Sequence, residues 1–226
     1  MVLLDRLSRF KKRLSIRAEN DPLELDFSGP YFPQYLDQEL VSSPALALGM
    51  ARREMALVCN LIEEMMVDNF EGMIAWHPGI FQGVQAQGEG VEKIVTAIRD
   101  FLNKASNHPA SDQDAYRLLT SVNTANELQL LGKALIGFAG KPRDPFAPSA
   151  LEKVEEVVDT LLDLFRSTSA CLVTNDTALA EAVLARPCPT LPTHLPQLEQ
   201  IAEKIHFHCH CIARMVCHSK KTSSDN

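Results

Sequence analysis

The sequence has few aromatic residues and no long hydrophobic run. Its 226 residues include 1 Trp, 3 Tyr and 10 Phe, and no window approaches the roughly 18 consecutive apolar residues that a membrane-spanning helix needs. The first residues do not form a signal peptide, because basic residues interrupt each apolar stretch before it reaches the length of a signal-peptide core. We therefore expect a soluble chain that is not secreted.

An excess of positive charge is also lacking. Lys and Arg total 22 against 29 Asp and Glu, so the formal net charge is -7. A protein that binds nucleic acid over much of its surface is basic, so a net negative charge argues against a nucleic acid partner. Hydrophobic residues make up 46% and charged residues 23%, a composition that excludes a disordered chain.

Paired-cysteine and catalytic motifs are missing as well. The six cysteines contain no CxxC pair, which fits free thiols in a reducing compartment and predicts a cytosolic location. No P-loop, GxSxG or HExxH motif is present, and no second carboxylate-histidine helix completes a dinuclear centre of the ferritin type. We therefore expect no enzymatic activity.

Charge is unevenly distributed along the chain. Residues 1–18 hold six Lys or Arg and one Asp, net +5, which leaves 16 basic and 28 acidic residues, net -12, for the rest. Apolar residues recur there at near-helical spacing, a pattern typical of a basic amphipathic segment on an anionic membrane or just below a membrane helix. A solvated terminus is the alternative. The residues expected to contact the membrane are Arg6, Arg9, Lys11, Lys12 and Arg13.

After a proline-rich connector, the sequence from Pro44 onward has helical periodicity and lacks the alternation that marks strands. It predicts an all-α body. Ser43 is the expected N-cap of a first helix to about residue 68, and the glycines and proline of residues 70–88 predict a loop. Two further helices are expected over residues 90–105 and 111–140, the last of them with a capping box at its start.

The second half repeats this order of helices. A capping box at Ser149 and Glu152 predicts a helix to about residue 169, Asp176 caps a short helix to about residue 185, and a long helix covers about 195–218. Residues 127–135 align with residues 197–205, so that apolar positions coincide. We predict two tandem three-helix bundles. The expected units are a basic segment with connector over 1–43, a first bundle over 44–140, and a second bundle with a polar tail over 141–226.

Four residues of the last helix follow helical spacing and share one strip: Glu199, Glu203, His206 and His210. Carboxylates and imidazoles in this arrangement on a bundle helix bind iron, zinc or manganese. The strip predicts a transition-metal site, and the alternative is a solvated polar flank whose side chains interact with one another. The equivalent positions of the first half include Gln129 and Lys133, which are poor ligands.

Three runs of sequence resemble a known family. YLDQELVSSPALALGMARREMALVCNLIEEMM at residues 35–66 is similar to the entry into the PhoU-like cytosolic domain at the C-terminus of bacterial sodium/phosphate cotransporters. SVNTANELQLLGKALIGF at 121–138 resembles the third-helix pattern of PhoU, and LEQIAEKI at 198–205 resembles its second copy. The resemblance extends over about residues 35–215.

This resemblance implies two three-helix bundles that regulate phosphate uptake without catalysis. Several members carry metal clusters on Glu-x-x-x-Asp motifs; Glu199 and Glu203 match the second motif with Glu replacing Asp, and Gln129 and Lys133 replace the first. The implied partner is the membrane domain of a phosphate transporter or the membrane surface, and homo-oligomers are left open. The alternatives are a metal-binding helical bundle, as a metal store or metal-dependent enzyme, and a soluble phosphate-signalling adaptor that docks onto a basic protein.

Overall fold

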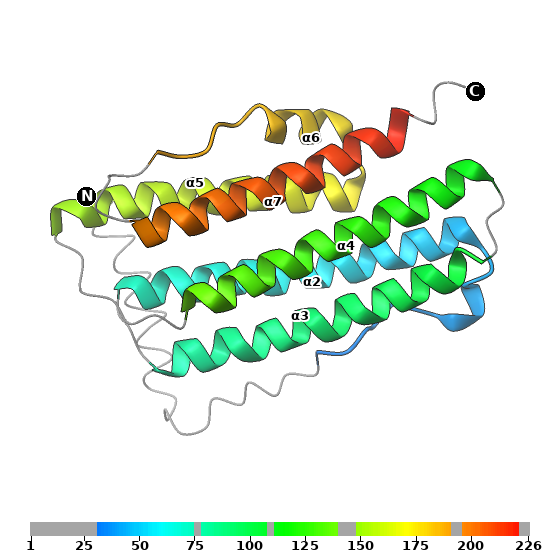
Figure 1. The fold of residues 1–226 in the computed structure, drawn as a ribbon, viewed down its shortest axis with the longest axis horizontal. Helices are drawn as coiled ribbons and strands as arrows, with labels where there is room; N and C mark the ends of the chain where they lie inside the picture. The colour runs from blue at the N-terminus through cyan, green and yellow to red at the C-terminus, as the bar shows by residue number, and fades with distance from the viewer. Residues whose placement is uncertain (1–30, 75–77, 108–110, 140–147, 191–195, 222–226) are drawn as a thin grey trace.

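Every regular element that the structure describes is a helix. The computed structural model describes residues 31–74, 78–107, 111–139, 148–190 and 196–221 (Figure 1). Within these residues no strand occurs, which confirms the all-α prediction, and no helix is both long and apolar enough to cross a membrane. The elements are η1 (Gln38–Leu40), α2 (Pro44–Ile74), α3 (Pro78–Ala105), α4 (Asp112–Ala139), α5 (Pro148–Thr174), α6 (Thr177–Leu184) and α7 (Pro196–Lys221).

The long helices lie side by side along one axis (Figure 1). Helices α2, α3 and α4 all contact one another, and α5, α6 and α7 do the same. Contacts of α2 with α5 and of α4 with α7 join the two sets. The boundary that we expected near residue 140 lies at residues 140–147, outside the described residues, and the division into two units stays a prediction.

The predicted loop over residues 70–88 is wrong. Helix α2 continues to Ile74, and α3 begins at Pro78, since proline fits the first helical position where no backbone N–H is needed. The glycines of this region lie inside helices, and no described glycine has a positive φ. At Gly88 an added Cβ would lie 2.3 Å from Ile136 Cδ1 on α4. This glycine therefore serves close packing of α3 on α4 rather than a turn.

Helix ends follow local hydrogen bonding. Ser111 Oγ accepts the backbone N–H of Asp114 at 3.1 Å, as the predicted capping box requires. Asp176 Oδ1 accepts from Ala178 N and Leu179 N, which confirms the predicted cap of α6. Helix α5 begins at Pro148, one residue before the predicted cap, and ends at Thr174 rather than near residue 169. The side chain expected to cap it, Ser149, lies outside the described side chains.

Two residues, Asn175 and Asp176, separate α5 from α6. Asn175 has φ 54, the left-handed conformation that often ends a helix. The N–H of Asp176 then donates to Cys171 O at 3.1 Å, which closes α5 with a Schellman-type bond while the same residue caps α6. The tight junction places short α6 against both α5 and α7.

The core follows the apolar positions that the sequence indicates. On α7 the apolar residues at three- and four-residue spacing form a seam whose described members are all buried: Leu198, Ala202, Ile205, Cys209, Ile212 and Val216. The aligned positions of α4, which are Leu128, Leu131 and Leu135, are each 0% exposed. Since α4 and α7 pack together, the two similar runs contribute to one shared interior.

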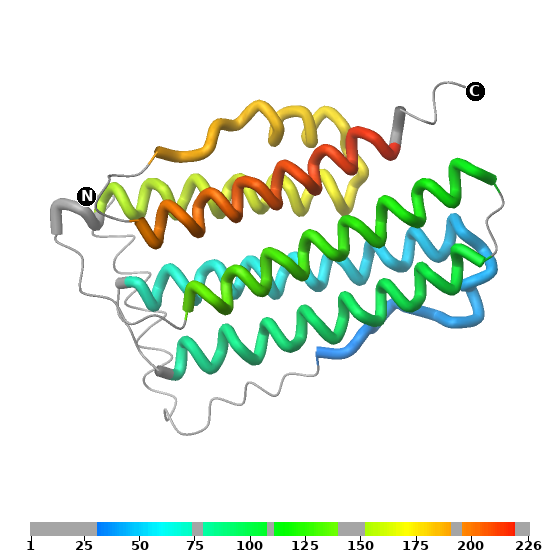
Figure 2. Tube along the Cα trace, in the orientation of Figure 1, coloured from blue at the N-terminus to red at the C-terminus, as the bar shows by residue number. Residues whose placement is uncertain are grey.

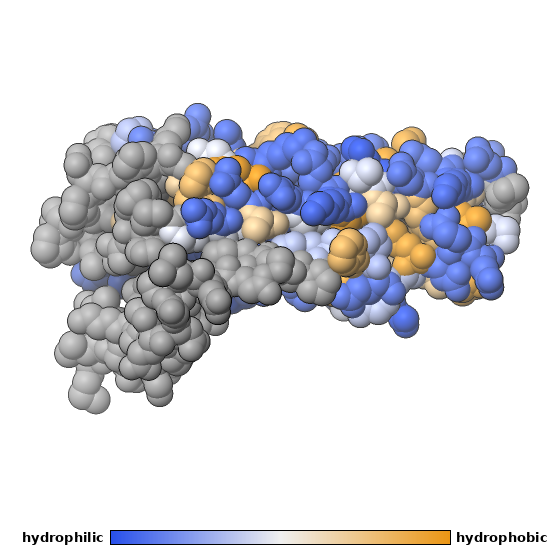
Figure 3. Space-filling model, turned by 90° about the horizontal axis from the view of Figure 1, so that it is seen from below, coloured by the Kyte–Doolittle hydropathy of each residue, from blue (hydrophilic) through white to orange (hydrophobic). Residues whose placement is uncertain are grey.

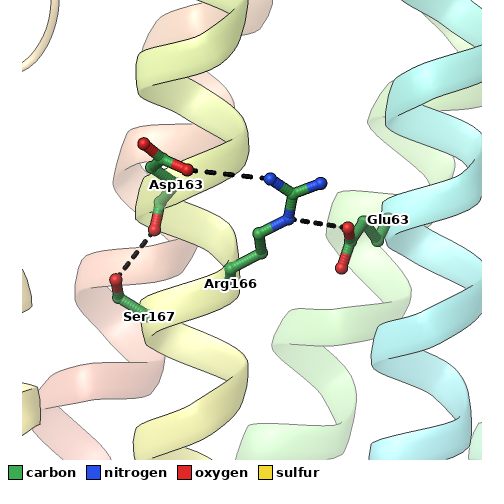
Figure 4. Close-up of polar contacts among 4 residues, drawn as sticks. All are labelled: Glu63, Asp163, Arg166 and Ser167. Carbon is green, nitrogen blue, oxygen red and sulfur yellow. Dashed lines mark hydrogen bonds and ion pairs between the residues drawn. The ribbon is translucent and has the colours of Figure 1, made fainter.

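An ion pair on the surface joins α2 to α5. Arg166 Nε lies 2.8 Å from Glu63 Oε1, and its NH1 lies 3.7 Å from Asp163 Oδ1 on the same helix (Figure 4). The hydrogen bond to Glu63 is the main cause of a raised pKa at Arg166. Because these groups are largely hydrated, the pair is worth about 0.2–1 kcal/mol and contributes mainly to the alignment of the two helices.

Gly49 offers a direct test of helix energetics. It lies in α2, is exposed, and an added Cβ would meet nothing within 4 Å. We expect Gly49→Ala to raise the free energy of unfolding by about 0.5–1 kcal/mol, because alanine restricts the unfolded chain and favours the helix. Urea unfolding followed by circular dichroism measures this change. Unchanged or lower stability would show that the glycine has a role that the fold does not reveal.

Candidate functional site

The predicted metal strip lies along α7, where it divides into two parts. Glu199 and Glu203 are exposed. The imidazoles of His206 and His210 stack with their ring centroids 3.9 Å apart, and His206 Nε2 lies 3.0 Å from the carbonyl of Arg186, in the segment after α6. That nitrogen donates to the carbonyl, because a carbonyl oxygen only accepts. The hydrogen bond of His206 thus connects α7 to the segment that follows α6.

No assembled metal centre is found in the part of the chain that the structure describes. No group of three His, Cys, Asp or Glu side chains there could hold a metal ion. Cys188 lies near the strip, but burial, followed by the charges of Glu203 and Glu199, raises the pKa of its thiol. A protonated thiol is a poor metal ligand. The metal prediction therefore rests on sequence spacing and gains no support from the geometry.

The equivalent positions of the first half make contacts between helices. Gln129 Nε2 donates to Glu92 Oε1 at 3.4 Å, and Lys133 Nζ lies 3.5 Å from the same oxygen. Glu92 belongs to α3, so both residues connect α4 with α3 on the surface. Lys133 neutralises the nearby carboxylate rather than presenting a ligand, consistent with the sequence-based view of this position.

His210 should make stability depend on pH. Burial, then His206 and Arg214, lower its pKa, whereas the nearby carbonyls of Arg186 and Val183 raise it. Its Nε2 is buried and has no hydrogen-bond partner among the described residues. A histidine with a lowered pKa in the folded state takes up a proton more readily when unfolded, so its contribution to stability is present above about pH 6.5 and is lost as pH falls.

We therefore expect the free energy of unfolding to decrease between pH 7.5 and pH 5.5, and to decrease less in His210→Gln. Urea titrations at both pH values measure the difference. His218→Gln, at an exposed position of the same helix, is the matched control and should keep the wild-type pH dependence. An equal decrease in His210→Gln and in the wild type would contradict the prediction.

A buried polar pair across α4 and α7 was not predicted from the sequence. His208 Nδ1 lies 2.7 Å from Glu127 Oε2, and the two side chains are only 11% and 19% exposed. An ionised carboxylate only accepts, so the imidazole N–H donates. The available signal was Glu127 itself, an acidic residue one position before the buried Leu128 of the repeated run.

A second feature that the sequence analysis missed is a fully buried carboxylate. Glu54 of α2 is 0% exposed. Its oxygens accept the backbone N–H of Gln34 at 3.0 Å and that of Tyr35 at 2.7 Å. The signal was present, because Glu54 lies among Ala51, Met55 and Val58 on the apolar stripe of α2 where a charge needs partners.

A cluster of buried polar residues lies between α2 and α3. Gln87 Nε2 donates to Asp68 Oδ2 at 3.1 Å, and both residues are at most 6% exposed. Asn69 Nδ2 donates to the carbonyl of Met65 at 2.8 Å. The amide oxygens of Asn69 and Gln87 are buried and have no hydrogen-bond partner among the described residues. The cluster makes this part of the interface polar and hence specific in its pairing.

Three cysteines belong to the interior. Burial raises the pKa of Cys59 to about 11 and those of Cys171 and Cys209 to about 12. Their thiols stay protonated at neutral pH and act as packing groups. All six cysteines are free.

The predicted membrane-contact residues lie outside the described residues. Arg6, Arg9, Lys11, Lys12 and Arg13 all precede Tyr31, the first described residue. Their contact with a membrane stays a prediction.

No protein family, curated protein or solved structure compared with this chain matches it.

Proposed function

We propose that the chain is a non-enzymatic, PhoU-like regulatory domain that acts with a sodium-dependent phosphate transporter at the cytoplasmic side of a membrane. The proposal includes the finer architecture of two tandem three-helix units. In this view residues 1–30 lead to the membrane or to a membrane domain, and the helical body carries the regulatory state.

The main support is the position of the two runs that resemble the third helices of PhoU. Residues 121–138 lie in α4 and residues 198–205 lie in α7, and these helices contact each other. Both residues are buried at each of three aligned pairs of positions: Leu128 and Leu198, Leu131 and Ile201, and Leu135 and Ile205. A duplicated helix whose copies share one interior is what a tandem repeat of bundles requires.

Regulation by such a domain needs two states that contact the transporter differently. A ligand or partner can shift the balance between these states only by binding one of them more tightly. The contacts of α2 with α5 and of α4 with α7 join the two sets of helices, so a shift between the sets would repack these contacts.

Sodium-driven phosphate uptake tests the proposal. Uptake of labelled phosphate is measured in cells that carry the intact transport system and in cells whose protein lacks residues 35–226. We expect deletion to change the uptake rate, its repression by abundant phosphate, or both. Unchanged uptake under both low and high phosphate would contradict the proposed function.

Elemental analysis separates this proposal from the metal-binding alternative. Protein purified without a histidine tag should contain no stoichiometric iron, zinc or manganese if the domain regulates without metal. A stoichiometric metal that disappears in Glu203→Ala would instead support the metal-binding bundle, and would show that the exposed strip of α7 rearranges to bind it.

A further inference from the structure

Residues 31–43, which include the short helix η1, form a strap on the outside of the helical body. The strap runs along α3 and reaches the start of α2 (Figure 2). Leu36 and Val41 pack against the core, while Phe32 is 65% exposed and Tyr35 40% exposed on the outer side. Figure 3 shows the molecule from below, with hydrophobic side chains scattered among hydrophilic ones. No residue of the strap is buried, so a few specific contacts rather than deep burial hold it.

The central contact is the carboxylate of Glu54. Both of its oxygens lie 3.0 Å from Gln34 N, and one lies 2.7 Å from Tyr35 N. Hydrogen bonds to a charged group are stronger than neutral ones, and a buried carboxylate without such donors would be costly. Two consecutive backbone N–H groups of the strap thus satisfy the buried charge of α2.

The start of the strap lies on a glycine of α3. An added Cβ at Gly90 would lie 2.5 Å from Tyr31 Cγ and 2.8 Å from its Cβ, so only glycine admits this approach. Burial, then the charges of Glu64 and Asp68 of α2, raise the pKa of Tyr31. Further along, Lys104 Nζ of α3 donates to Gln38 Oε1 at 3.0 Å.

We propose that the strap is a releasable element whose attachment through Glu54 and Gly90 couples the chain before residue 31 to the helical body. The hydrogen bonds between the strap and Glu54 are of a kind that can break and form again. When the strap leaves, water can solvate the Glu54 carboxylate in place of the two N–H groups, so release exposes a group that hydrates well. The α2–α4 and α5–α7 contacts are made between helices alone, so we expect them to persist when the strap is released.

This inference rests on the proposed function for its biological meaning. A pull or a binding event on residues 1–30 would favour release of the strap. Because local opening costs less than global unfolding, such an element can exchange between two states while the body stays folded. Glu54 and Gly90 are then positioning residues for regulation.

Native-state hydrogen exchange of the full chain tests the strap directly. In the wild type we expect the amides of Gln34 and Tyr35 to exchange through an opening that leaves α4 and α7 protected. Glu54→Gln, which removes the charge, and Gly90→Ala, which leaves the charge in place, should each speed this exchange about tenfold or more, since weaker anchoring lowers the cost of opening. Gly49→Ala makes the same change as Gly90→Ala in open space and should leave strap exchange unchanged.

The proposal is overturned if Gln34 and Tyr35 exchange only as fast as the interior of α4 and α7, which would make the strap part of the global unit. It is also overturned if neither substitution changes their exchange. Because Gly90→Ala and Glu54→Gln act on different contacts, a failure of one variant to fold still leaves the other as a test.

Uptake assays separate the strap from the proposed function. We expect Gly90→Ala and Glu54→Gln to shift uptake toward that of the deletion of residues 35–226, and Gly49→Ala to leave uptake unchanged. If the deletion alters uptake but the strap variants do not, the coupling role is wrong and the regulatory function stands. If the deletion has no effect while strap exchange responds, the proposed function fails and the releasable strap remains.

Discussion

Replacing Glu127 by alanine is expected to lower the free energy of unfolding by about 1–3 kcal/mol. The substitution leaves the imidazole of His208, which is 9% exposed as a residue, without the carboxylate that lies 2.7 Å from its Nδ1. A buried donor that loses its acceptor retains the full cost of leaving water. The pair connects α4 to α7, so its loss should also loosen the junction between the two sets of helices.

Chemical denaturation of Glu127→Ala, His208→Phe and the double variant measures this effect. Glu89→Ala, at an exposed position of α3, is the matched control and should change stability by no more than about 0.5 kcal/mol. Because the two partners contact each other, the double variant should cost less than the sum of the single ones. A Glu127→Ala variant as stable as Glu89→Ala would show that the pair contributes nothing.

Gly88→Ala is expected to destabilise the protein by about 1–3 kcal/mol, in contrast to the gain from Gly49→Ala. An added Cβ would lie 2.3 Å from Ile136 Cδ1 and 2.7 Å from its Cγ1, far inside the contact distance of about 3.5–4.0 Å between carbon atoms. The higher helix propensity of alanine offsets only part of this overpacking. The same substitution thus has opposite signs at two helical positions that differ only in their surroundings.

A double variant isolates the cause. Ile136→Val removes Cδ1, the nearest clashing atom, and should restore part of the stability that Gly88→Ala loses, while it costs about 0.5–1.5 kcal/mol on its own. Thermal or urea unfolding of the four proteins completes the cycle. Additive effects would mean that the clash with Ile136 is not the reason for glycine at residue 88.

Local signals in the sequence located most helix ends. Ser111 and Asp176 cap α4 and α6 as predicted, because a side-chain oxygen two or three residues ahead of free backbone N–H groups acts locally and needs no tertiary contact. The buried seam of α7 was equally readable, since helical periodicity determines which residues share a face.

The loop over residues 70–88 was predicted wrongly from its glycines, and the reason is physical. A glycine can mark a turn or a close approach of two helices, and these uses look alike without the partner helix. Gly88 and Gly90 are close-approach glycines because Ile136 of α4 and Tyr31 of the strap lie against them. Both partners are distant in the sequence, so no local pattern around residue 88 could distinguish the two uses.

The predicted metal strip of α7 also depends on contacts that the sequence does not reveal. Spacing placed Glu199, Glu203, His206 and His210 on one strip of α7, and they do lie along that helix. His206 and His210 stack on each other and His206 Nε2 donates to the carbonyl of Arg186, whereas Glu199 and Glu203 are exposed. Helical spacing predicts which residues share a face, but it does not predict what the neighbouring backbone offers them.

The sequence by itself therefore determined the all-helical class, most helix ends and the apolar seams, because these depend on backbone preference and on the 3.6-residue period. Only the tertiary structure decided that residues 70–74 and 78–88 belong to two helices, that Glu127 meets His208, and that Glu54 holds the strap. Each of these depends on contacts between distant segments, where a buried charge or a missing side chain has meaning only once its partner is in place.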